Sequence, residues 1–336
     1  MDNISKAIEA ARIKFPLINC KLDELMKYHT SFKIGGPLRA MFFPQDTEAL
    51  VELCSLLYGY GATPLIIGNG TNLLVDDSKP LELIAVKTTG INGVKQTGEV
   101  EITAEAGISL PRLAVFAYEC SLTGLEYAHG IPGSLGGAVS INAGAYGNEM
   151  KDVVYSTNVF ACSSDNTMLC SSGTAASETA ALNGSISLNR TSNNHHIYTV
   201  SGMEHGFSYR HSRFSDTADI ILSSVLKLEK SDKNRIGAKM DDLYSRRFEK
   251  QPLDLPNAGS IFKRPNNGYA AALIEQAGLK GFSIGGAQVS EKHSGFIVNS
   301  GGATFTDIMA VIEHIRATIH KRFGVELEPE VKIIRQ

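Results

Sequence analysis

The sequence predicts an α+β protein with two domains or three small ones. The chain has 336 residues, and single domains usually hold about 100 to 200. Its composition, 43% hydrophobic and 20% charged, is ordinary for a globular protein with a substantial core. Helical and strand-like patterns alternate along the chain, but never in the strand, glycine turn and helix order that a Rossmann fold requires.

Helical spacing and capping residues predict six helices. They fall at residues 2–14, 46–57, 109–120, 236–250, 270–277 and 304–323. Apolar runs predict strands at 38–43, 64–67, 81–107, 153–161, 220–228 and 296–299. The tail, residues 325–334, alternates strictly and should carry Glu326, Glu328 and Glu330 on one face.

Charge and cysteine content limit the partners that we expect. A net charge of −3 gives no broad basic field for nucleic acid or anionic lipid. The chain begins with charged residues, and no apolar run approaches the roughly 18 residues of a membrane helix. Five cysteines without a C-x-x-C pair indicate reduced thiols and no metal site: Cys20, Cys54, Cys120, Cys162 and Cys170. We therefore expect a cytoplasmic protein without an evident obligate protein partner.

Two glycine-bearing loops are candidates for binding an anion. The longer one, residues 130–147, holds six glycines, so backbone N–H groups can approach a ligand closely. The other, residues 68–72, reads Gly-Asn-Gly-Thr-Asn between two apolar runs. Together the loops could hold the pyrophosphate of a dinucleotide. The alternatives are a crossover packed with small residues for the longer loop and a plain hairpin turn for the shorter.

Neither common nucleotide-binding fingerprint is present. Leu73 stands where the third glycine of a dinucleotide fingerprint belongs, and Asp76 and Asp77 follow instead of a clear helix. No G-x-x-x-x-G-K-[ST] motif occurs, which excludes a P-loop NTPase.

Residues 163–196 differ in composition from the rest of the chain. They are rich in Ser, Thr, Asn and Ala, and we expect an exposed insertion without a catalytic role. His195 and His196 at its edge have no third ligand nearby for a metal. His29, earlier in the chain, fits a hydrogen-bonded structural histidine better than a catalytic one.

Six motifs in order resemble one family, the UDP-N-acetylenolpyruvoylglucosamine reductases (the MurB family). They cover roughly residues 28–334 and together are highly specific. They are His29–Gly36, Gly68–Leu74, Gly130–Gly137 with Asn142–Tyr146, Tyr209-Arg-His-Ser, Ala258–Pro265 and Leu327–Val331.

The resemblance implies a fold and two cofactors, FAD and NADPH. The fold is an FAD-binding module of the vanillyl-alcohol-oxidase (PCMH) type plus a C-terminal α/β substrate-binding domain. Its two α+β subdomains would span residues 1–80 and 81–229, and the substrate domain 230–336. The residues expected to hold FAD are Gly68, Asn69, Gly70, Thr71, Asn72, Leu73, Gly130, Ile131, Pro132, Gly133, Ser134, Gly136, Gly137, Asn142, Ala143 and Gly144.

The resemblance also implies a reaction and its catalytic residues. NADPH would reduce the flavin, which then delivers hydride to C3 of the enolpyruvyl ether of a UDP-sugar. Arg210 would stabilise the developing negative charge, Ser260 would donate a proton to C2, and Glu330 would lie near the enolate carboxylate. Glu330 rather than Glu328 is chosen by the motif alone.

Substrate contacts follow less directly. Tyr209, Lys263, Arg264 and His293 are candidates for the UDP phosphates or the sugar. The 50 residues between Arg210 and Ser260 resemble the family branch that lacks an extra tyrosine-bearing loop over the substrate.

Two other functions remain possible from the sequence. The first is an FAD oxidase of the same superfamily acting on a small alcohol. Against it, the glycine-rich segment has no His or Cys in the arrangement typical of a covalently tethered flavin. His129 precedes the segment, but a single match is weak support. The second is a non-catalytic flavin-binding module, which the presence of Arg210, Ser260 and Glu330 argues against.

Overall fold

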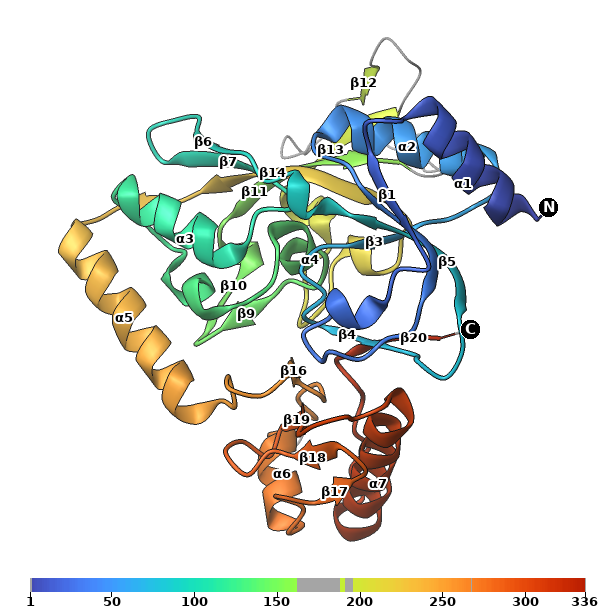
Figure 1. Ribbon diagram of the computed structural model, residues 1–336. Coiled ribbons are helices and arrows are strands. Elements are labelled where there is room, and N and C mark those ends of the chain that lie inside the picture. The colour runs from blue at the N-terminus through green and yellow to red at the C-terminus, as the bar shows by residue number, and fades with distance from the viewer. Residues whose placement is uncertain (1, 162–187, 191–195, 267, 336) are drawn as a thin grey trace, which may run out of the picture.

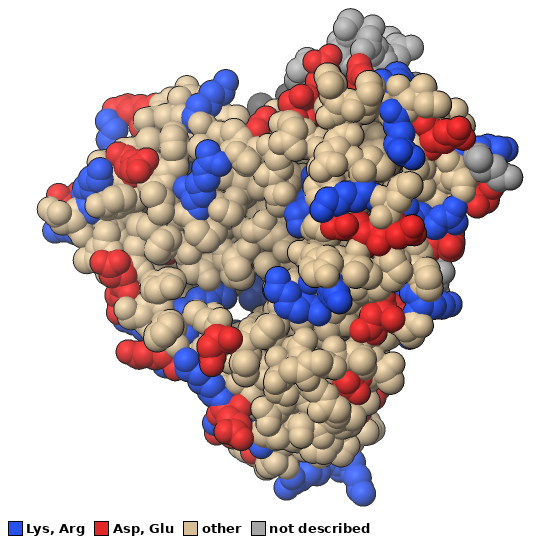
Figure 2. Space-filling model, in the orientation of Figure 1, with Lys and Arg blue, Asp and Glu red and all other residues tan. Residues whose placement is uncertain are grey.

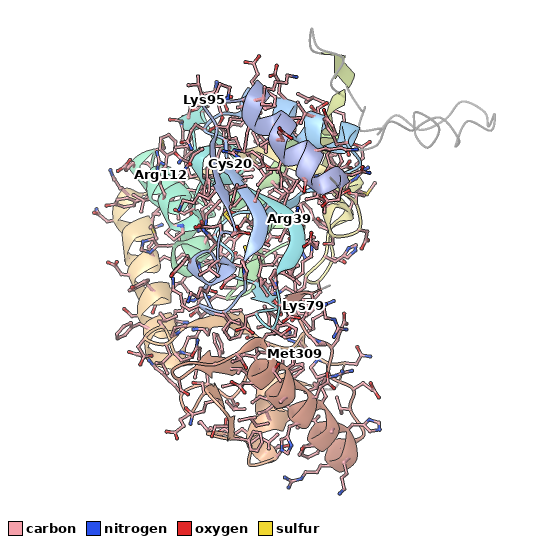
Figure 3. The ribbon with its side chains drawn as sticks, turned by 45° about the vertical axis from the view of Figure 1, so that its right-hand side comes forward. Cys20, Arg39, Lys79, Lys95, Arg112 and Met309 are labelled. Atoms are coloured by element: carbon pink, nitrogen blue, oxygen red, sulfur yellow. The ribbon has the colours of Figure 1, made fainter. Side chains whose placement is uncertain are left out.

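The structure is a computed structural model that describes residues 2–161, 188–190, 196–266 and 268–335. The polar segment expected at 163–196 lies outside the described residues apart from 188–190 and 196. Figure 1 shows a larger upper body, built from two sheets and their helices, above a smaller C-terminal domain. The same arrangement is seen in Figure 3, where Met309 of the C-terminal domain lies below Arg39 of the upper body.

The first sheet has four strands in the order β1-β2-β5-β3. Strands β2, β5 and β3 are parallel, and β1 pairs antiparallel with β2. Apolar side chains of α1 and α2, among them Ala11 and Leu53, are buried in one core with Phe42 and Val86 of the sheet. The elements are α1 (Asn3–Lys14), β1 (Asn19–Leu22), β2 (Leu38–Phe43), α2 (Thr47–Gly59), β3 (Leu65–Ile67) and β5 (Leu81–Lys87).

The second sheet has six antiparallel strands in the order β12-β13-β11-β14-β7-β6. Helices α3, α4 and α5 share its main core. The elements are β6 (Val94–Gln96), β7 (Glu101–Glu105), α3 (Leu110–Glu119), α4 (Leu135–Ser140), β11 (Val154–Phe160), β12 (Leu188–Arg190), β13 (His196–Ser201), β14 (Ile220–Lys227) and α5 (Lys233–Lys250). Two small strand pairs accompany it: β8 (Leu122–Thr123) with β15 (Glu229–Lys230), and β9 (Gly144–Ala145) with β10 (Asn148–Glu149).

The C-terminal domain is a four-stranded antiparallel sheet, β16-β19-β18-β17, with two helices. The chain then returns to the upper body, where β20 (Lys332–Ile334) pairs parallel with β4 (Leu73–Val75). The other elements are β16 (Asn257–Ser260), α6 (Ala270–Gln276), β17 (Ser283–Ile284), β18 (Ala287–Val289), β19 (Phe296–Asn299) and α7 (Phe305–Phe323). This returning strand brings Glu330 next to the first glycine loop.

The structure shifts both internal boundaries that the sequence suggested. The boundary at residue 80 falls just before β5, which belongs to the first sheet. The boundary at 229 separates α5 from the second sheet, yet Ile236, Met240 and Leu243 of α5 are buried in the core of that sheet. The sequence does not reveal this packing, because α5 is rich in charged residues and only one of its faces is apolar.

The six expected helices all form, although α5 begins three residues earlier than expected, after Asp232, and α6 has no side-chain cap. Asp46 accepts from the backbone N–H of Ala49 at 2.8 Å, and Thr304 accepts from that of Asp307 at 3.1 Å. Such side-chain caps satisfy donors that a helix start leaves free. No helix in the described part of the chain is long and apolar enough to cross a membrane.

The tail departs from the expected long strand. Only Lys332–Ile334 is a strand, and the three glutamates do not share one environment. The side chains of Glu326 and Glu328 are 79% and 69% exposed, whereas that of Glu330 is 15% exposed. The difference arises because the chain passes from the C-terminal domain into the upper body between Glu328 and Glu330. At this point Pro329 forms an isolated β-bridge with Phe262.

Candidate functional site

The two glycine loops meet across the two subdomains. The side-chain amide of Asn69 donates to the carbonyl of Pro132 at 2.7 Å. A Cβ on Gly68 would lie 1.9 Å from Oγ of Ser134, so no larger residue fits there unless Ser134 moves. The hairpin alternative for residues 68–72 is wrong, since β3 and β4 pair with different strands.

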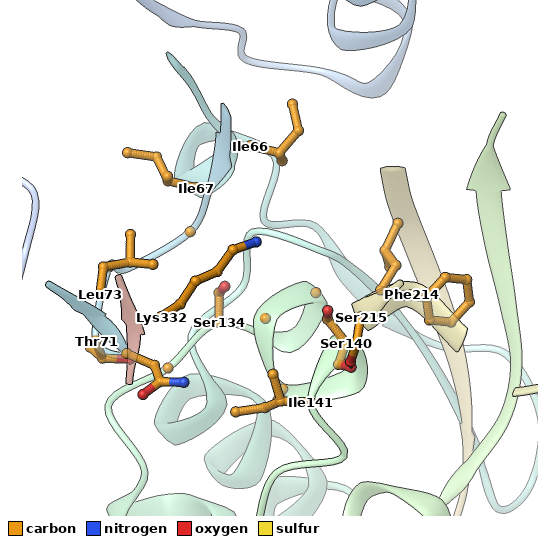
Figure 4. A pocket seen from close by; sticks show the side chains of 18 of the residues that line it. Ile66, Ile67, Thr71, Leu73, Ser134, Ser140, Ile141, Phe214, Ser215 and Lys332 are labelled. Carbon is orange, nitrogen blue, oxygen red and sulfur yellow. The ribbon is translucent and has the colours of Figure 1, made fainter. Parts of the chain in front are cut away.

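A cavity of about 580 Å³ lies between these loops. In Figure 4, Ile66, Ile67 and Leu73 lie on one side of it, Ser134 and Ile141 on another, and Lys332 reaches across. The whole first loop lines the cavity, and so does half of the second. The expected cofactor residues found in its wall are Gly68, Asn69, Gly70, Thr71, Asn72, Leu73, Ile131, Gly133, Ser134, Gly136, Gly137 and Ala143.

Four residues expected to hold the cofactor do not line this cavity: Gly130, Pro132, Asn142 and Gly144. A Cβ on Gly130 would lie 2.9 Å from the side chain of Arg247, and one on Gly144 would lie 2.4 Å from the carbonyl of Asn148. Asn142 is fully buried, and its amide bonds only to other parts of the protein. Packing thus also accounts for Gly130, Asn142 and Gly144, whereas Pro132 is exposed, and contact of these four residues with a cofactor stays a prediction.

Arg210 and Glu330 form an ion pair in the cavity wall. Nε of Arg210 donates to Oε1 of Glu330 at 2.7 Å, and Nη2 donates to the carbonyl of Gly144 at 3.2 Å. Arg210 has φ of +55°, an uncommon conformation for a residue with a side chain. Burial raises the pKa of Glu330, and the charge and hydrogen bond of Arg210 only partly oppose that effect.

Glu330 is also fixed through its backbone, which links three segments of the chain. Its carbonyl accepts from the side-chain amide of Asn72 at 3.1 Å, and its N–H donates to the carbonyl of Ile261 at 2.7 Å. Ile261 follows Ser260, the exposed last residue of β16. Ser260 does not line the cavity, but this bond brings its strand alongside Glu330.

A second cavity, of about 490 Å³, contains three of the expected substrate residues: Tyr209, Lys263 and Arg264. The hydroxyl of Tyr209 accepts from the backbone N–H of Arg264 at 3.1 Å. Lys263 lines both cavities and pairs with Glu328 at 2.6 Å. Figure 2 shows basic side chains around the hollow between the upper body and the C-terminal domain.

His293 lines neither cavity, and its contact with the substrate stays a prediction. Its Nδ1 accepts from the backbone N–H of Gly295 at 3.1 Å, and its ring packs edge-on against Phe296. Burial lowers its pKa, which favours the neutral form. His29 is hydrogen-bonded as expected, with Glu24 at 2.8 Å and Lys87 at 3.1 Å.

Sequence reasoning missed part of the cavity wall. The segment 214–221 contributes Phe214, Ser215, Thr217, Ala218, Asp219, Ile220 and Ile221. Lys332 was also missed, although it stands two residues after Glu330 and residues two apart share a face of an extended chain. No sequence pattern marks residues 214–221 as part of the cavity wall, because their position there depends on how the two subdomains meet.

The fold and the site define an FAD-binding protein of the vanillyl-alcohol-oxidase type with a C-terminal domain. The antiparallel sheet of that domain makes it α+β instead of the α/β domain expected. Residues 38–165 match the model of the FAD binding domain. Residues 251–334 match that of the UDP-N-acetylenolpyruvoylglucosamine reductase C-terminal domain. The chain belongs to the UDP-N-acetylenolpyruvoylglucosamine reductase family.

Relatives and a solved structure carry this assignment. The reductase of Caldanaerobacter subterraneus is 45% identical over 93% of this chain and 93% of its own length. That of Thermotoga petrophila is 42% identical over 92% of this chain and 97% of its own. The crystal structure of the Thermus caldophilus reductase superposes with a TM-score of 0.70 at 26% identity, covering 95% of this chain and 99% of that one.

Proposed function

We propose that this protein reduces UDP-N-acetylglucosamine enolpyruvate to UDP-N-acetylmuramate with NADPH and FAD, in the cytoplasm, as a step of peptidoglycan precursor synthesis. The observation that carries the proposal is the Arg210–Glu330 pair in the wall of the glycine-lined cavity. The names of the relatives supply the substrate class. The chemistry of the site supports the cofactor and the roles of the catalytic residues.

The residues of the cavity fit FAD. Glycine backbone on both sides allows the close approach that a diphosphate needs, while Leu65, Leu110 and Ile221 offer apolar surface for rings. When bound, FAD would supply the hydride chemistry, by which hydride from NADPH is passed to C3 of the enolpyruvyl group. Gly68–Leu73 and Gly133–Gly137 would hold its diphosphate, and Lys332 adds a positive charge in the same cavity.

Arg210 is suited to stabilise the charge that develops on the substrate. Hydride addition at C3 leaves negative charge at C2 and on the adjacent carboxylate. Two of the guanidinium nitrogens are held by Glu330 and Gly144, so the group is fixed before the substrate arrives. A preorganised cation of this kind is commonly the largest catalytic contribution.

Ser260 and Glu330 complete the set of proposed catalytic residues. Ser260 donates its hydroxyl proton to C2, which a weak acid can do only because that carbon is strongly basic. Its hydroxyl makes no hydrogen bond with the residues that the structure describes, so it is free to turn toward a substrate. Glu330, buried and with a raised pKa, adjusts the charge around the carboxylate of the substrate.

The second cavity is the proposed place for the nucleotide part of the substrate. Lys263 and Arg264 offer positive charge there for a diphosphate, and Tyr209 offers a ring and a hydroxyl. Lys263 joins this cavity to the one that contains Arg210. A single extended substrate could therefore lie across both.

The test is the Ser260→Ala variant, studied one half-reaction at a time. NADPH should reduce its flavin at the normal rate, because that step needs no proton at C2. Reoxidation by the UDP-sugar enolpyruvyl ether should slow by about 10²–10⁴-fold. Ser283→Ala, which changes an exposed serine of β17 in the same domain, is the matched control and should react normally.

Each possible result separates this function from the two alternatives. Normal reoxidation in Ser260→Ala would show that the proton comes from elsewhere. A wild-type protein that turns over an alcohol and oxygen instead of the enolpyruvyl ether is an oxidase. Bound flavin without turnover identifies a binding module.

A further inference from the structure

Asn142 lies at the centre of a hydrogen-bond network behind Arg210. It follows helix α4 and is fully buried, with φ of +46°. Its Nδ2 donates to Oε2 of Glu149 at 2.8 Å and to the carbonyl of Ser208 at 2.9 Å. Its Oδ1 accepts from the backbone N–H of Lys151 at 2.9 Å. Both amide hydrogens are thus used within the protein.

The bond to Ser208 fixes the turn that carries Arg210. Ser208 and His211 exchange backbone hydrogen bonds of 3.0 and 3.3 Å around Tyr209 and Arg210. A residue with a side chain keeps a positive φ only where its surroundings impose it. The donation from Asn142 to the carbonyl of Ser208 is one such constraint on Arg210.

The other end of this turn is anchored to the same place. The hydroxyls of Ser212 and Ser215 both donate to the carbonyl of Ser140, at 2.6 and 2.8 Å. Ser140 ends α4 and stands two residues before Asn142. Residues 140–142 therefore hold the catalytic turn from both sides.

The hydrogen bond from Asn142 to Glu149 also affects Arg210, through Gly144. Glu149 lies opposite Gly144 in the β9–β10 pair. The carbonyl of Gly144 accepts from Nη2 of Arg210. By holding Glu149, Asn142 helps to place the acceptor of the guanidinium as well as the backbone that carries it.

We propose that Asn142 is a positioning residue for Arg210 rather than a contact of the cofactor. The proposal rests on the catalytic role of Arg210 given above. Asparagine suits the position because it supplies two donors and one acceptor and tolerates a positive φ. Aspartate keeps the shape but loses both donors, and it places a second carboxylate beside Glu149.

The decisive variant is Asn142→Asp, measured separately in the two half-reactions. Reoxidation by the enolpyruvyl ether should slow by about 10²-fold, the usual cost of a misplaced catalytic group. Flavin affinity and flavin reduction by NADPH should stay within about twofold of the wild type. Asn148→Asp, the same change in the neighbouring β9–β10 hairpin but without contact to Ser208, is the matched control and should leave both half-reactions unchanged.

A double-mutant cycle separates positioning from general damage. In an Arg210→Ala background, Asn142→Asp should slow reoxidation by no more than about twofold, because its effect passes through Arg210. A full 10²-fold loss in that background, or weaker FAD binding in Asn142→Asp alone, overturns the proposal.

A second variant covers the case in which Asn142→Asp folds poorly. Adding Glu149→Gln removes the pair of like charges and lets the amide introduced at position 149 donate to the carboxylate introduced at position 142. Folding should then recover, while slow reoxidation persists because the carbonyl of Ser208 still lacks its donor. Normal reoxidation in this double variant overturns the proposal. If the wild type itself does not react with the enolpyruvyl ether, the proposed function fails instead.

Discussion

The glycine loops of the cofactor cradle contribute backbone and empty space, whereas Arg210, Ser260 and Glu330 contribute functional groups. The cradle is local, since each loop is continuous in sequence and the two meet through Asn69 and Pro132. The catalytic group comes from three distant segments joined by bonds to Glu330. Adding atoms should therefore damage the cradle, and removing atoms should damage the catalytic group.

Arg210→Ala tests the catalytic side and has the largest expected effect. Loss of the guanidinium should slow reoxidation of the flavin by substrate by about 10³-fold, because a preorganised charge is removed. Flavin content and flavin reduction by NADPH should not change, since the glycine loops remain. Stopped-flow absorbance of the flavin measures both half-reactions.

Two further arginine variants sharpen this result. Arg210→Lys keeps the charge but cannot serve Glu330 and Gly144 together, so we expect an intermediate loss of about 10²-fold. Arg246→Ala removes a surface cation of α5 that pairs only with Asp242 among the described residues, and activity should not change. Loss of flavin in Arg210→Ala would contradict the division between cradle and catalytic group.

Gly68→Ala tests the cradle. The new methyl group would lie 1.9 Å from Oγ and 2.9 Å from Cβ of Ser134, so Ser134 must move. Overpacking of this kind costs about 1–3 kcal/mol, which corresponds to FAD affinity weakened by roughly five- to 150-fold. Flavin fluorescence during titration of the apoprotein measures the change.

The serine provides a rescue for this variant. Adding Ser134→Gly removes the atoms that the methyl group meets, and FAD affinity should recover. Gly59→Ala is the matched control, because a Cβ there meets nothing within 4 Å, and it should bind FAD normally. Unchanged affinity in Gly68→Ala would show that the two loops do not need their close contact.

The same contrast explains how much could be predicted from sequence. Local signals identified six helices and both glycine loops, because propensity and turn chemistry act over a few residues, but they missed α4 inside the longer loop. The sequence did not distinguish glycines that line the cavity, such as Gly68, from those packed elsewhere, such as Gly130. That distinction depends on what each Cβ would meet, which only the tertiary structure defines.

The catalytic group required a different kind of information. By alternation alone, the tail offers three equal candidates for the site, Glu326, Glu328 and Glu330. In the structure Glu330 is the one that pairs with Arg210. The resemblance to a family selected Glu330, whereas periodicity could not distinguish it from the other two. For His293 the structure shows a local hydrogen bond with Gly295, which the sequence does not indicate, and its contact with the substrate stays a prediction.

The smallest expected effects are on folding stability, and they concern two glutamates, Glu126 and Glu330. Burial alone would raise the pKa of Glu126, but hydrogen bonds from Thr123 and from the backbone N–H of Gly124 outweigh it and lower that pKa. For Glu330 burial prevails over Arg210, and the pKa is raised. The ionised form is therefore stabilised by folding at Glu126 and destabilised by folding at Glu330.

The two glutamine variants, Glu126→Gln and Glu330→Gln, should consequently shift stability in opposite directions. At neutral pH, Glu126→Gln should lose about 2 kcal/mol, since charged hydrogen bonds are removed. This loss should shrink as the pH falls below the ordinary value of 4.5 and through the lowered pKa of Glu126. Glu330→Gln should be at least as stable as the wild type above the raised pKa of Glu330, an advantage that disappears below 4.5.

Thermal unfolding of the apoprotein between about pH 4 and pH 8 measures both curves under the same conditions. Destabilisation of both variants at neutral pH would mean that the Arg210–Glu330 pair stabilises the fold as ordinary ion pairs do. Opposite signs would show that Glu330 is kept ionised at a cost in folding stability, as expected of a residue retained for its place beside Arg210.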